Sequence, residues 1–216
     1  MDFQFDFDKE DRRKKRNHIL SAILRWILEL GAVILLAYVL VAFTVEQTEV
    51  IGNSMEETLM EGETILVNKL AFKRNPPQRY DLIVFKQSGG EHMYYDIKRV
   101  IGLPGETIQI KEGEIYINGE MLIEPIKVDP ILLPGFAESP VTLDEDEFFV
   151  LGDNRNNSED SRFANVGNVV EDEIVGMAWL RINPLTFVNK SKKNYKRPSP
   201  TPIPTPVEET GITEAP

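Results

Sequence analysis

The sequence predicts a mainly β domain carried on one N-terminal transmembrane helix. One apolar run near the N-terminus is about as long as a bilayer is thick, and the rest of the chain has short runs rich in Val, Ile, Tyr and Phe. Gly, Pro and Asn separate those short runs, as turns do. The 216 residues, with 42% hydrophobic content, suffice for one ordinary domain beside the helix and exclude a wholly disordered chain.

The transmembrane helix is expected over residues 26–45. Residues 30–45 are uncharged and mostly apolar, and extension back to Trp26 gives enough helix to cross a hydrocarbon layer of ~30 Å. Glu29 lies one helical turn from Arg25, where pairing lowers the free-energy cost of a charged side chain near the membrane. A cleaved signal peptide or a buried core helix would have a similar composition. We favour an uncleaved anchor, because no Ala-x-Ala-like cleavage site follows the run.

Charge predicts the direction of the span. The basic run Arg12–Arg16 and Arg25 precede it, and the first basic residue after it is Lys69. By the positive-inside rule, residues 1–25 are expected in the cytoplasm and residues 46–189 outside it, at the cell membrane.

The segment after the span is acidic. Residues 44–189 carry 12 basic and 26 acidic side chains, in a stretch of ordinary single-domain size. Because phosphate backbones attract basic surfaces, we expect no nucleic-acid partner. Residues 190–216 alternate proline with small or polar residues, which predicts a disordered tail outside the domain of residues 46–189.

Short runs rich in Val, Ile, Tyr and Phe place nine strands in the outer domain. Asn118-Gly119 between two of them is a hairpin signal, because both turn positions favour positive φ. The expected strands are Thr48–Ile51, Thr64–Val67, Asp81–Lys86, Met93–Ile101, Thr107–Lys111, Glu114–Ile117, Glu120–Ile123, Glu147–Leu151 and Ile174–Ile182.

One apolar segment, Ile131–Phe136, lacks strand alternation and carries turn residues. It is expected either to pack in the core, which we favour, or to dip into the membrane interface.

The side-chain inventory restricts the chemistry. There is no cysteine, which excludes a thiol nucleophile, a disulfide framework and a Cys-ligated metal. Of the two histidines, His18 precedes the span, so a Ser-His-Asp triad or multi-His metal site would depend on His92 alone. We expect no metal and no cofactor. A hydrolase here needs two carboxylates, or a hydroxyl nucleophile with another base, such as a lysine that burial keeps neutral.

Three segments carry the candidate groups. Ser54 follows Gly52, which permits a sharp turn that aims N–H groups at an oxyanion, although such pairs also occur in turns and helix caps. Lys98 lies in an apolar strand, where it is expected to share a face with Asp96 and where an edge-strand role is the alternative. The segment Gly152–Arg162 is dense in hydroxyls, carboxylates and arginines, which suits a network that orients a buried group.

Four ordered boxes resemble those of bacterial type I signal peptidases, the membrane-bound serine endopeptidases that remove signal peptides from exported preproteins. The resemblance runs from the N-terminus to about Ile182. The boxes are Ser-Met-x-x-Thr-Leu at Ser54–Leu59, Gly-x-x-Ile-x-Val-Asn-Lys at Gly62–Lys69, Lys-Arg-Val-Ile-Gly-Leu-Pro-Gly at Lys98–Gly105 and Gly-Asp-Asn-Arg-x-Asn-Ser-x-Asp-Ser-Arg at Gly152–Arg162. It implies a signal-peptidase-like antiparallel β catalytic domain.

The resemblance also implies roles for individual residues. Ser54 would be the nucleophile and Lys98 the general base. Ser158 would orient Lys98, and Met55 would lie beside the scissile bond. Asp160 and Arg162 would brace their loop as an ion pair. Gly52 stands where some members have a serine that donates to the oxyanion, so the Ser54 N–H is expected to carry that task.

The partners implied are preproteins with small residues at positions −1 and −3 of the signal peptide, membrane lipid and the export machinery. Two positions depart from the family pattern: Glu57 replaces a proline, and Asp96 replaces an aromatic residue two places before the lysine. Tyr95, one place off, is expected to face away from the site. Asp96 is expected to favour the charged form of Lys98.

The sequence permits two other functions. A LexA-like self-cleaving protein shares the serine–lysine chemistry but would carry a DNA-binding helix-turn-helix in place of the span. A non-catalytic, membrane-tethered β domain that binds exported proteins would keep the anchor without the reaction.

Overall fold

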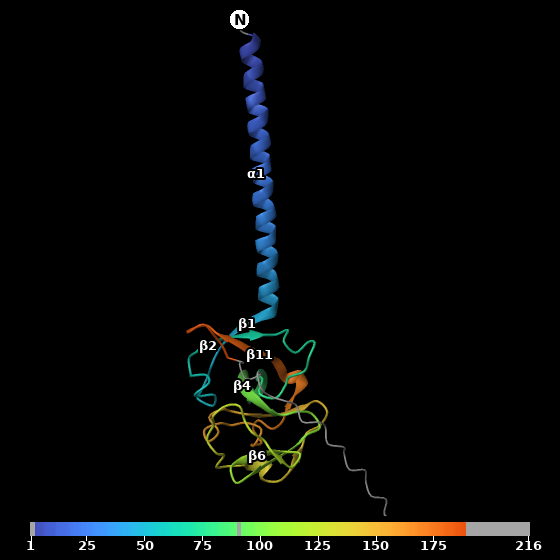
Figure 1. Ribbon diagram of the computed structural model, residues 1–216, viewed down its shortest axis with the longest axis vertical. Coiled ribbons are helices and arrows are strands. Elements are labelled where there is room, and N and C mark those ends of the chain that lie inside the picture. Colours follow the sequence, from blue (N-terminus) through green and yellow to red (C-terminus); the bar gives the residue numbers. More distant parts are fainter. Residues whose placement is uncertain (1–2, 90–91, 189–216) are drawn as a thin grey trace, which may run out of the picture.

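A long N-terminal helix leads into a β domain. The structure is a computed structural model that describes residues 3–89 and 92–188, so the expected tail of residues 190–216 lies outside the described residues. Helix α1 (Phe3–Thr44) extends away from the domain (Figure 1). Within it, the segment Asn17–Thr44 contains an 18-residue window with a mean hydropathy of 2.4, and it is long and apolar enough to cross a membrane. The helix ends at Thr44, one residue before the expected end of the span.

The chain passes from the helix directly into the first strand. Strand β1 (Val45–Glu49) begins at the residue after α1, so the expected strand Thr48–Ile51 was placed three residues too late. Val50 is buried, and Ile51 is exposed and leads into the turn that carries Ser54. The alternation of Val, Gln and Glu in β1 was hidden by its continuity with the apolar helix.

The larger sheet has the order β1-β2-β11-β3-β4-β9-β10, with β12 paired to β11. All its pairings are antiparallel, which confirms the expected fold class. After β1, its strands are β2 (Thr64–Asn68), β3 (Leu82–Gly89), β4 (His92–Gly102), β9 (Glu147–Leu151), β10 (Val169–Val170), β11 (Ile174–Arg181) and β12 (Thr186–Phe187).

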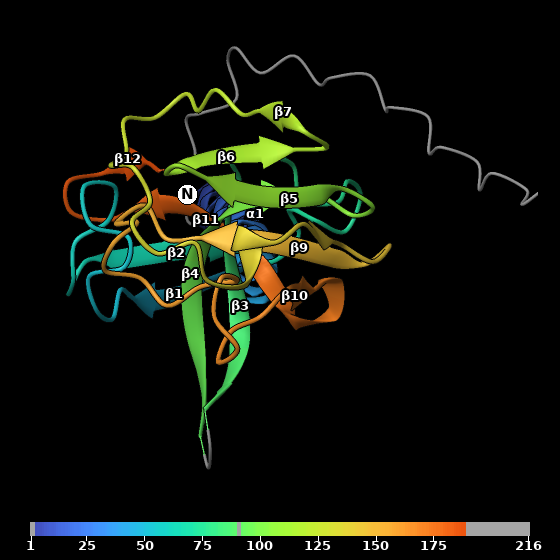
Figure 2. The same cartoon turned by 90° about the horizontal axis from the view of Figure 1, so that it is seen from below.

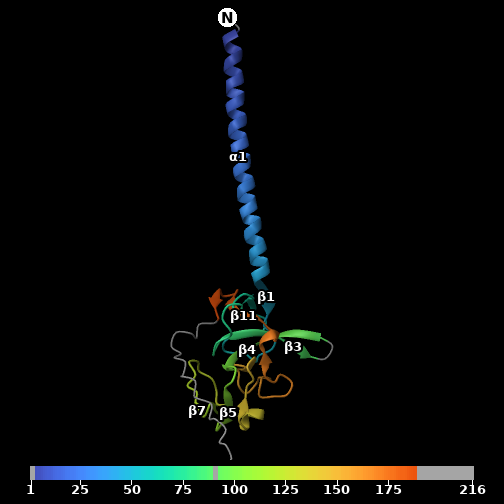
Figure 3. The ribbon, with the colours of Figure 1, turned by 90° about the vertical axis from the view of Figure 1, so that its right-hand side faces the viewer.

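The smaller sheet lies at the end of the domain away from α1 (Figures 1 and 3). Its order is β7-β6-β5-β8, also antiparallel, and Asn118 and Gly119 take the positive φ expected of the hairpin turn between β6 and β7. Its strands are β5 (Thr107–Lys111), β6 (Glu114–Ile117), β7 (Glu120–Met121) and β8 (Val141–Thr142), and the 3₁₀ helices η1 (Gly135–Glu138) and η2 (Glu171–Glu173) lie in loops.

Strands β3 and β4 continue beyond their neighbours as a two-stranded hairpin, which projects from the domain in Figure 2. Register pairs Ile83 with Lys98 and Phe85 with Asp96 along this hairpin. The middle of β4 therefore lies at the inner end of the hairpin, between β3 and β9, where apolar packing can bury a polar side chain.

Apolar residues from both sides of the Ser54 turn form one core cluster. It contains Val50, Met55, Leu59, Ile65, Val67, Leu82, Val84, Ile97 and Ala178, all buried. Because Met55 and Leu59 reach into this cluster and Ile97 is the neighbour of Lys98, the same core holds the turn and strand β4 in a fixed relation.

The segment Ile131–Phe136 is only partly a core segment. Ile131 is buried, but Leu132 is 75% exposed and Leu133 is 66% exposed, so the favoured expectation of core packing is wrong for these two residues. The segment is held by its backbone: Leu132 N–H donates to Asn156, and Phe136 N–H donates to the Arg162 carbonyl oxygen at 2.9 Å.

Candidate active site

The Ser54 turn is fixed by hydrogen bonds within itself. The Met55 carbonyl oxygen accepts from the N–H groups of Thr58 at 3.1 Å and Leu59 at 2.8 Å. The side chains of Met55 and Leu59 are buried, so they anchor the turn from below. Gly52 precedes the serine with φ 77°, a conformation that glycine adopts without strain. The hydroxyl of Ser54 is thereby presented at the surface of a groove.

A second loop, residues 152–162, clamps the turn from the other side. Asn154 N–H donates to the Ser54 carbonyl oxygen at 3.0 Å, and the Thr58 hydroxyl donates to Asp153 at 2.5 Å. A glycine is needed at position 152, where the loop passes close to the Ser54 turn. A Cβ there would lie 2.2 Å from Ser158 Oγ and 2.5 Å from the Ser54 carbonyl oxygen.

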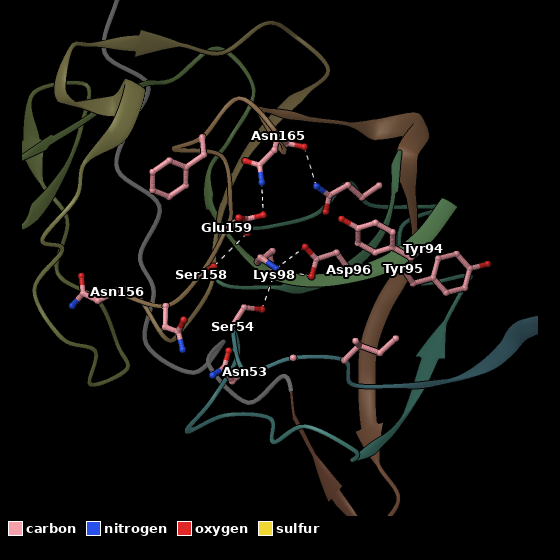
Figure 4. A pocket seen from close by; sticks show the side chains of 15 residues that line it. Asn53, Ser54, Tyr94, Tyr95, Asp96, Lys98, Asn156, Ser158, Glu159 and Asn165 are labelled. Atoms are coloured by element: carbon pink, nitrogen blue, oxygen red, sulfur yellow. Dashed lines mark hydrogen bonds and ion pairs between the residues drawn. The ribbon is translucent and has the colours of Figure 1, made fainter. Parts of the chain in front are cut away.

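Lys98 reaches the serine from strand β4. Its side chain is 2% exposed, and its Nζ lies 3.1 Å from Ser54 Oγ (Figure 4). The two residues are 44 positions apart in sequence, so the fold brings together the two groups that the resemblance paired. A buried amine within hydrogen-bond reach of a hydroxyl has the geometry required of a base and its nucleophile.

Asp96 also contacts Lys98. Its two carboxylate oxygens lie 2.5 and 2.6 Å from Nζ, and Oδ1 accepts the Ile97 N–H at 2.8 Å. Asp96 and Lys98 share a face of β4, as the alternation of the strand predicts.

The expected contact between Ser158 and Lys98 is not present. The Ser158 hydroxyl donates to the Glu159 carbonyl oxygen at 3.4 Å, and within the described chain no hydrogen bond joins it to Lys98. The physical reason is competition for the ammonium: a carboxylate is a stronger acceptor than a hydroxyl, and Asp96 takes up that position.

Asp160 and Arg162 form the expected ion pair, which is fully buried. Arg162 Nε and Nη2 lie 2.7 and 2.8 Å from the two oxygens of Asp160, and Asp160 Oδ2 also accepts the Gly152 N–H at 3.1 Å. Arg162 further donates to the carbonyl oxygens of Arg155 and Leu133. The pair therefore holds both ends of the 152–162 loop and connects that loop to the segment Ile131–Phe136.

Sequence reasoning missed a second buried ion pair. Arg99 points to the opposite face of β4 from Lys98 and binds Asp153 through two contacts of 2.7 and 2.6 Å. Because Asp153 also accepts from Thr58, the pair joins β4, the loop and the Ser54 turn. Arg99 follows Lys98 and Asp153 follows Gly152 inside the quoted boxes. This position next to candidate site residues could have indicated that the two side chains support the site.

Two residues lie differently from the expectation. The Met55 side chain is 1% exposed and packs in the core with Leu59, not along the groove, because these are the two side chains that the turn directs inward. Glu57 has φ 77°, which a proline cannot adopt, so the turn is built differently from one with the family's proline at this place.

Tyr95 was expected to face away, but it lines the groove with Tyr94 and Asp96. The two-stranded end of the β3–β4 hairpin is open on both faces, and two-stranded ribbons twist strongly. Burial, and then the charge and hydrogen bond of Glu46, raise the pKa of the Tyr95 phenol. The phenol is therefore protonated at neutral pH and is not the base of the site.

The groove above Ser54 has a volume of about 630 Å³. Its walls come from the Ser54 turn, the β3–β4 hairpin and the 152–162 loop, and Gln87 and Glu159 are joined through Asn165 at one end of it. An open groove with a serine and a buried amine at its base fits an extended peptide and suits acyl transfer from it.

Comparisons with known proteins agree with this chemistry. The family described as "Signal peptidase, peptidase S26" matches residues 23–183. The chain is 38% identical to a signal peptidase I of Leptolyngbya laminosa over 76% of this chain and 82% of that protein. It is 35% identical to signal peptidase I P of Bacillus subtilis subsp. natto, over 86% of this chain and 100% of that protein.

A solved structure is also similar, the crystal structure of a signal peptidase I from Enterococcus faecalis V583. It is 31% identical, the match covers 48% of this chain and 97% of that one, and the TM-score is 0.37. The family match spans most of the chain, and the two relatives align over 82% and 100% of their own length. The chain therefore belongs to the signal peptidase family, peptidase S26, and is a serine protease of the signal peptidase I type.

Proposed function

We propose that this protease cleaves signal peptides from preproteins with Ser54 as nucleophile and Lys98 as general base. The observation that carries the proposal is the contact of 3.1 Å between Lys98 Nζ and Ser54 Oγ at the base of the groove. The geometry supports a serine–lysine dyad, and the family supplies the substrate class.

The reaction follows from these positions. Neutral Lys98 takes the Ser54 proton as Oγ attacks the scissile carbonyl carbon, and an acyl-enzyme forms when Lys98 returns the proton to the leaving amine. A water molecule then gives a proton to Lys98 and attacks the acyl carbon. Lys98 returns that proton to Ser54 Oγ as the ester bond breaks, which restores the enzyme. The Ser54 N–H makes no hydrogen bond within the described part of the chain, so it is available to the oxyanion. Gly52 has no side chain to assist, which leaves this N–H the main donor.

The substrate enters as an extended segment with small residues at positions −1 and −3. This proposal comes from the family, and the groove is compatible with it, because the Ser54 turn and β4 offer backbone on both sides of the nucleophile. Ser158, Asp160 and Arg162 maintain the loop that forms one wall.

The chain carries one N-terminal apolar helix of a length that spans a membrane. We place residues 1–25 in the cytoplasm and the catalytic domain, residues 46–189, outside, as the basic residues before the span indicate. The tail, residues 190–216, then lies on the outer side too. A reporter enzyme fused to the C-terminus is expected to be active only outside the cytoplasm, and activity confined to the cytoplasm would reverse the orientation.

Membrane lipid is the second proposed partner. Phe43, at the end of α1, shares a cavity of about 400 Å³ with Leu70, Phe72, Lys69 and Lys73. Aromatic and basic side chains together at the end of a span are typical of a membrane interface. Contact with the export machinery is proposed on the same ground of position, since signal peptides emerge at that surface.

Cleavage of a purified preprotein tests the function. The wild type is expected to release the signal peptide, and Ser54→Ala and Lys98→Ala are each expected to lower kcat/KM by at least about a thousandfold. Ser139→Ala removes an exposed hydroxyl that does not line the groove and serves as the matched control. Cleavage by Ser54→Ala at the wild-type rate would reject the dyad, and a wild type that only binds the preprotein would indicate the tethered binding domain.

A further inference from the structure

The ammonium of Lys98 has two kinds of neighbour. Within the described chain its hydrogen bonds go to Ser54 Oγ at 3.1 Å and to both carboxylate oxygens of Asp96 at 2.5 and 2.6 Å. The carboxylate is therefore the closer partner. Asp96 is itself held in place, because its Oδ1 accepts the Ile97 N–H at 2.8 Å, which fixes the side chain against its own strand.

We propose that Asp96 is the positioning residue of Lys98 and a third member of the site. This inference rests on the proposed dyad and deepens it. Three observations carry it: the double contact with Nζ, the side chain held by Ile97 N–H, and the bond of Ser158 to Glu159 in place of Lys98. In Figure 4 Lys98 lies between Asp96 and Ser54.

The other charged and titratable groups around Lys98 are engaged elsewhere. On β4, Glu46 contributes to the raised pKa of Tyr95, and Tyr94 lines the groove. In the opposite loop, the carboxylate of Glu159 accepts from Asn165. Two further carboxylates belong to buried ion pairs, Asp153 with Arg99 and Asp160 with Arg162. Among the described side chains of the Ser54 turn and of β3, the polar ones that line the groove are Ser54, Asn53 and Gln87.

This arrangement has two opposite effects on catalysis. In the free enzyme, the carboxylate of Asp96 stabilises the ammonium form of Lys98 relative to the neutral amine that must take the Ser54 proton. In the acylation step the neutral amine takes the Ser54 proton and becomes an ammonium again. Asp96 then stabilises that charge as it forms, as the aspartate of a Ser-His-Asp triad does for its imidazolium.

The two effects predict a characteristic change in the pH profile of kcat/KM. In Asp96→Asn, which keeps an acceptor of the same shape but no charge, the acid limb is expected to move to lower pH by about one unit. The plateau of kcat at high pH is expected to fall about tenfold, because the ammonium formed in the transition state loses its carboxylate. KM is expected to change less than kcat, since Asp96 acts through Lys98.

The experiment compares full-length wild type, Asp96→Asn, Asp96→Phe and Glu159→Gln in detergent on one preprotein from low to high pH. Glu159→Gln is the matched control, because it removes a carboxylate of the same groove that does not contact Lys98, and its limb is expected to move less. Asp96→Phe replaces the asparagine variant in the test if that variant does not fold. Its acid limb is also expected to move to lower pH.

An acid limb that stays at the wild-type pH in a folded Asp96 variant overturns the inference, even if the plateau falls, because a merely structural role would lower activity without moving the limb. An equal shift of the acid limb in Glu159→Gln also overturns the inference, because the shift would then be caused by the net charge of the groove and not by the contact with Lys98. Either result leaves the dyad standing as long as Ser54→Ala is inactive. Activity in Ser54→Ala would reject the proposed function itself.

Discussion

Gly152 lies where the 152–162 loop passes so close to the Ser54 turn that it leaves no room for a Cβ. A methyl group there would lie 2.2 Å from Ser158 Oγ and 2.5 Å from the Ser54 carbonyl oxygen, and the second of these is backbone. Gly152→Ala is therefore expected to push the turn away from Lys98. Since displacements of about 1 Å can cost about a hundredfold in rate, kcat/KM should fall by roughly that factor.

Preprotein cleavage by purified enzyme measures this effect. Gly31→Ala is the control, because no atom lies within 4 Å of the Cβ it would add. That variant should retain wild-type activity. A Gly152→Ala enzyme within twofold of the wild type would show that the turn and the loop are not held as tightly as their hydrogen bonds indicate.

At the level of single residues, the sequence predicted identities better than contacts. Ser54, Lys98 and the Asp160–Arg162 pair lie where the ordered boxes indicated, although the catalytic roles stay proposals. The orientations of Met55 and Ser158 could not be predicted in this way. The orientation of Met55 depends on the core beneath the turn. The orientation of Ser158 depends on Asp96, which is distant from it in sequence and binds the Lys98 ammonium in its place.

The segment Ile131–Phe136 divides into one buried side chain and an exposed surface. Ile131 is 4% exposed, and Leu132 is 75% exposed. Ile131→Ala is expected to lower the free energy of unfolding by about 2–4 kcal/mol, because it leaves a cavity in the core beneath the small sheet. Leu132→Ala should change it by less than about 0.5 kcal/mol.

Urea unfolding in detergent, followed by near-ultraviolet circular dichroism, measures both values. The two substitutions remove side-chain atoms of the same number from isomeric residues of different burial, so the pair tests the side-chain placement directly. Equal destabilisation by the two substitutions would mean that Leu132 is covered in solution. Figures 1 and 3 show the small sheet, next to which this segment lies, at the end of the domain away from α1, which does not favour its insertion at the interface around the helix.

Strands were predicted correctly where the sequence pattern extends over four or five residues. They were missed where a strand is defined only by its hydrogen bonds to a partner strand. Thr107–Lys111, Glu114–Ile117 and Glu147–Leu151 have the predicted bounds, because each alternates or, in the last case, is apolar after its first residue. The two-residue strands β8, β10 and β12 were missed, since so short a segment has no period and exists only through its partner strand. For the same reason, β7 is shorter than the run from which it was predicted.

For the whole molecule, the central expectation is that the anchor and the catalytic domain suffice for the reaction. The proline-alternating tail cannot build a core, so truncation after Lys190 is expected to leave kcat/KM on a preprotein unchanged. A fall of more than tenfold, about 1.4 kcal/mol of transition-state stabilisation, would assign the tail a part in catalysis.

The claim on which the whole account depends is that Ser54 becomes acylated. Rapid acid quenching of the enzyme with a signal-peptide ester, at a pH where deacylation is slow, followed by digestion after glutamate, gives the peptide of residues 50–56, in which Ser54 is the only hydroxyl side chain. Mass spectrometry should find the acyl group on this peptide in the wild type and not in Ser54→Ala. An acyl group on another peptide, with 50–56 unmodified, would contradict the account.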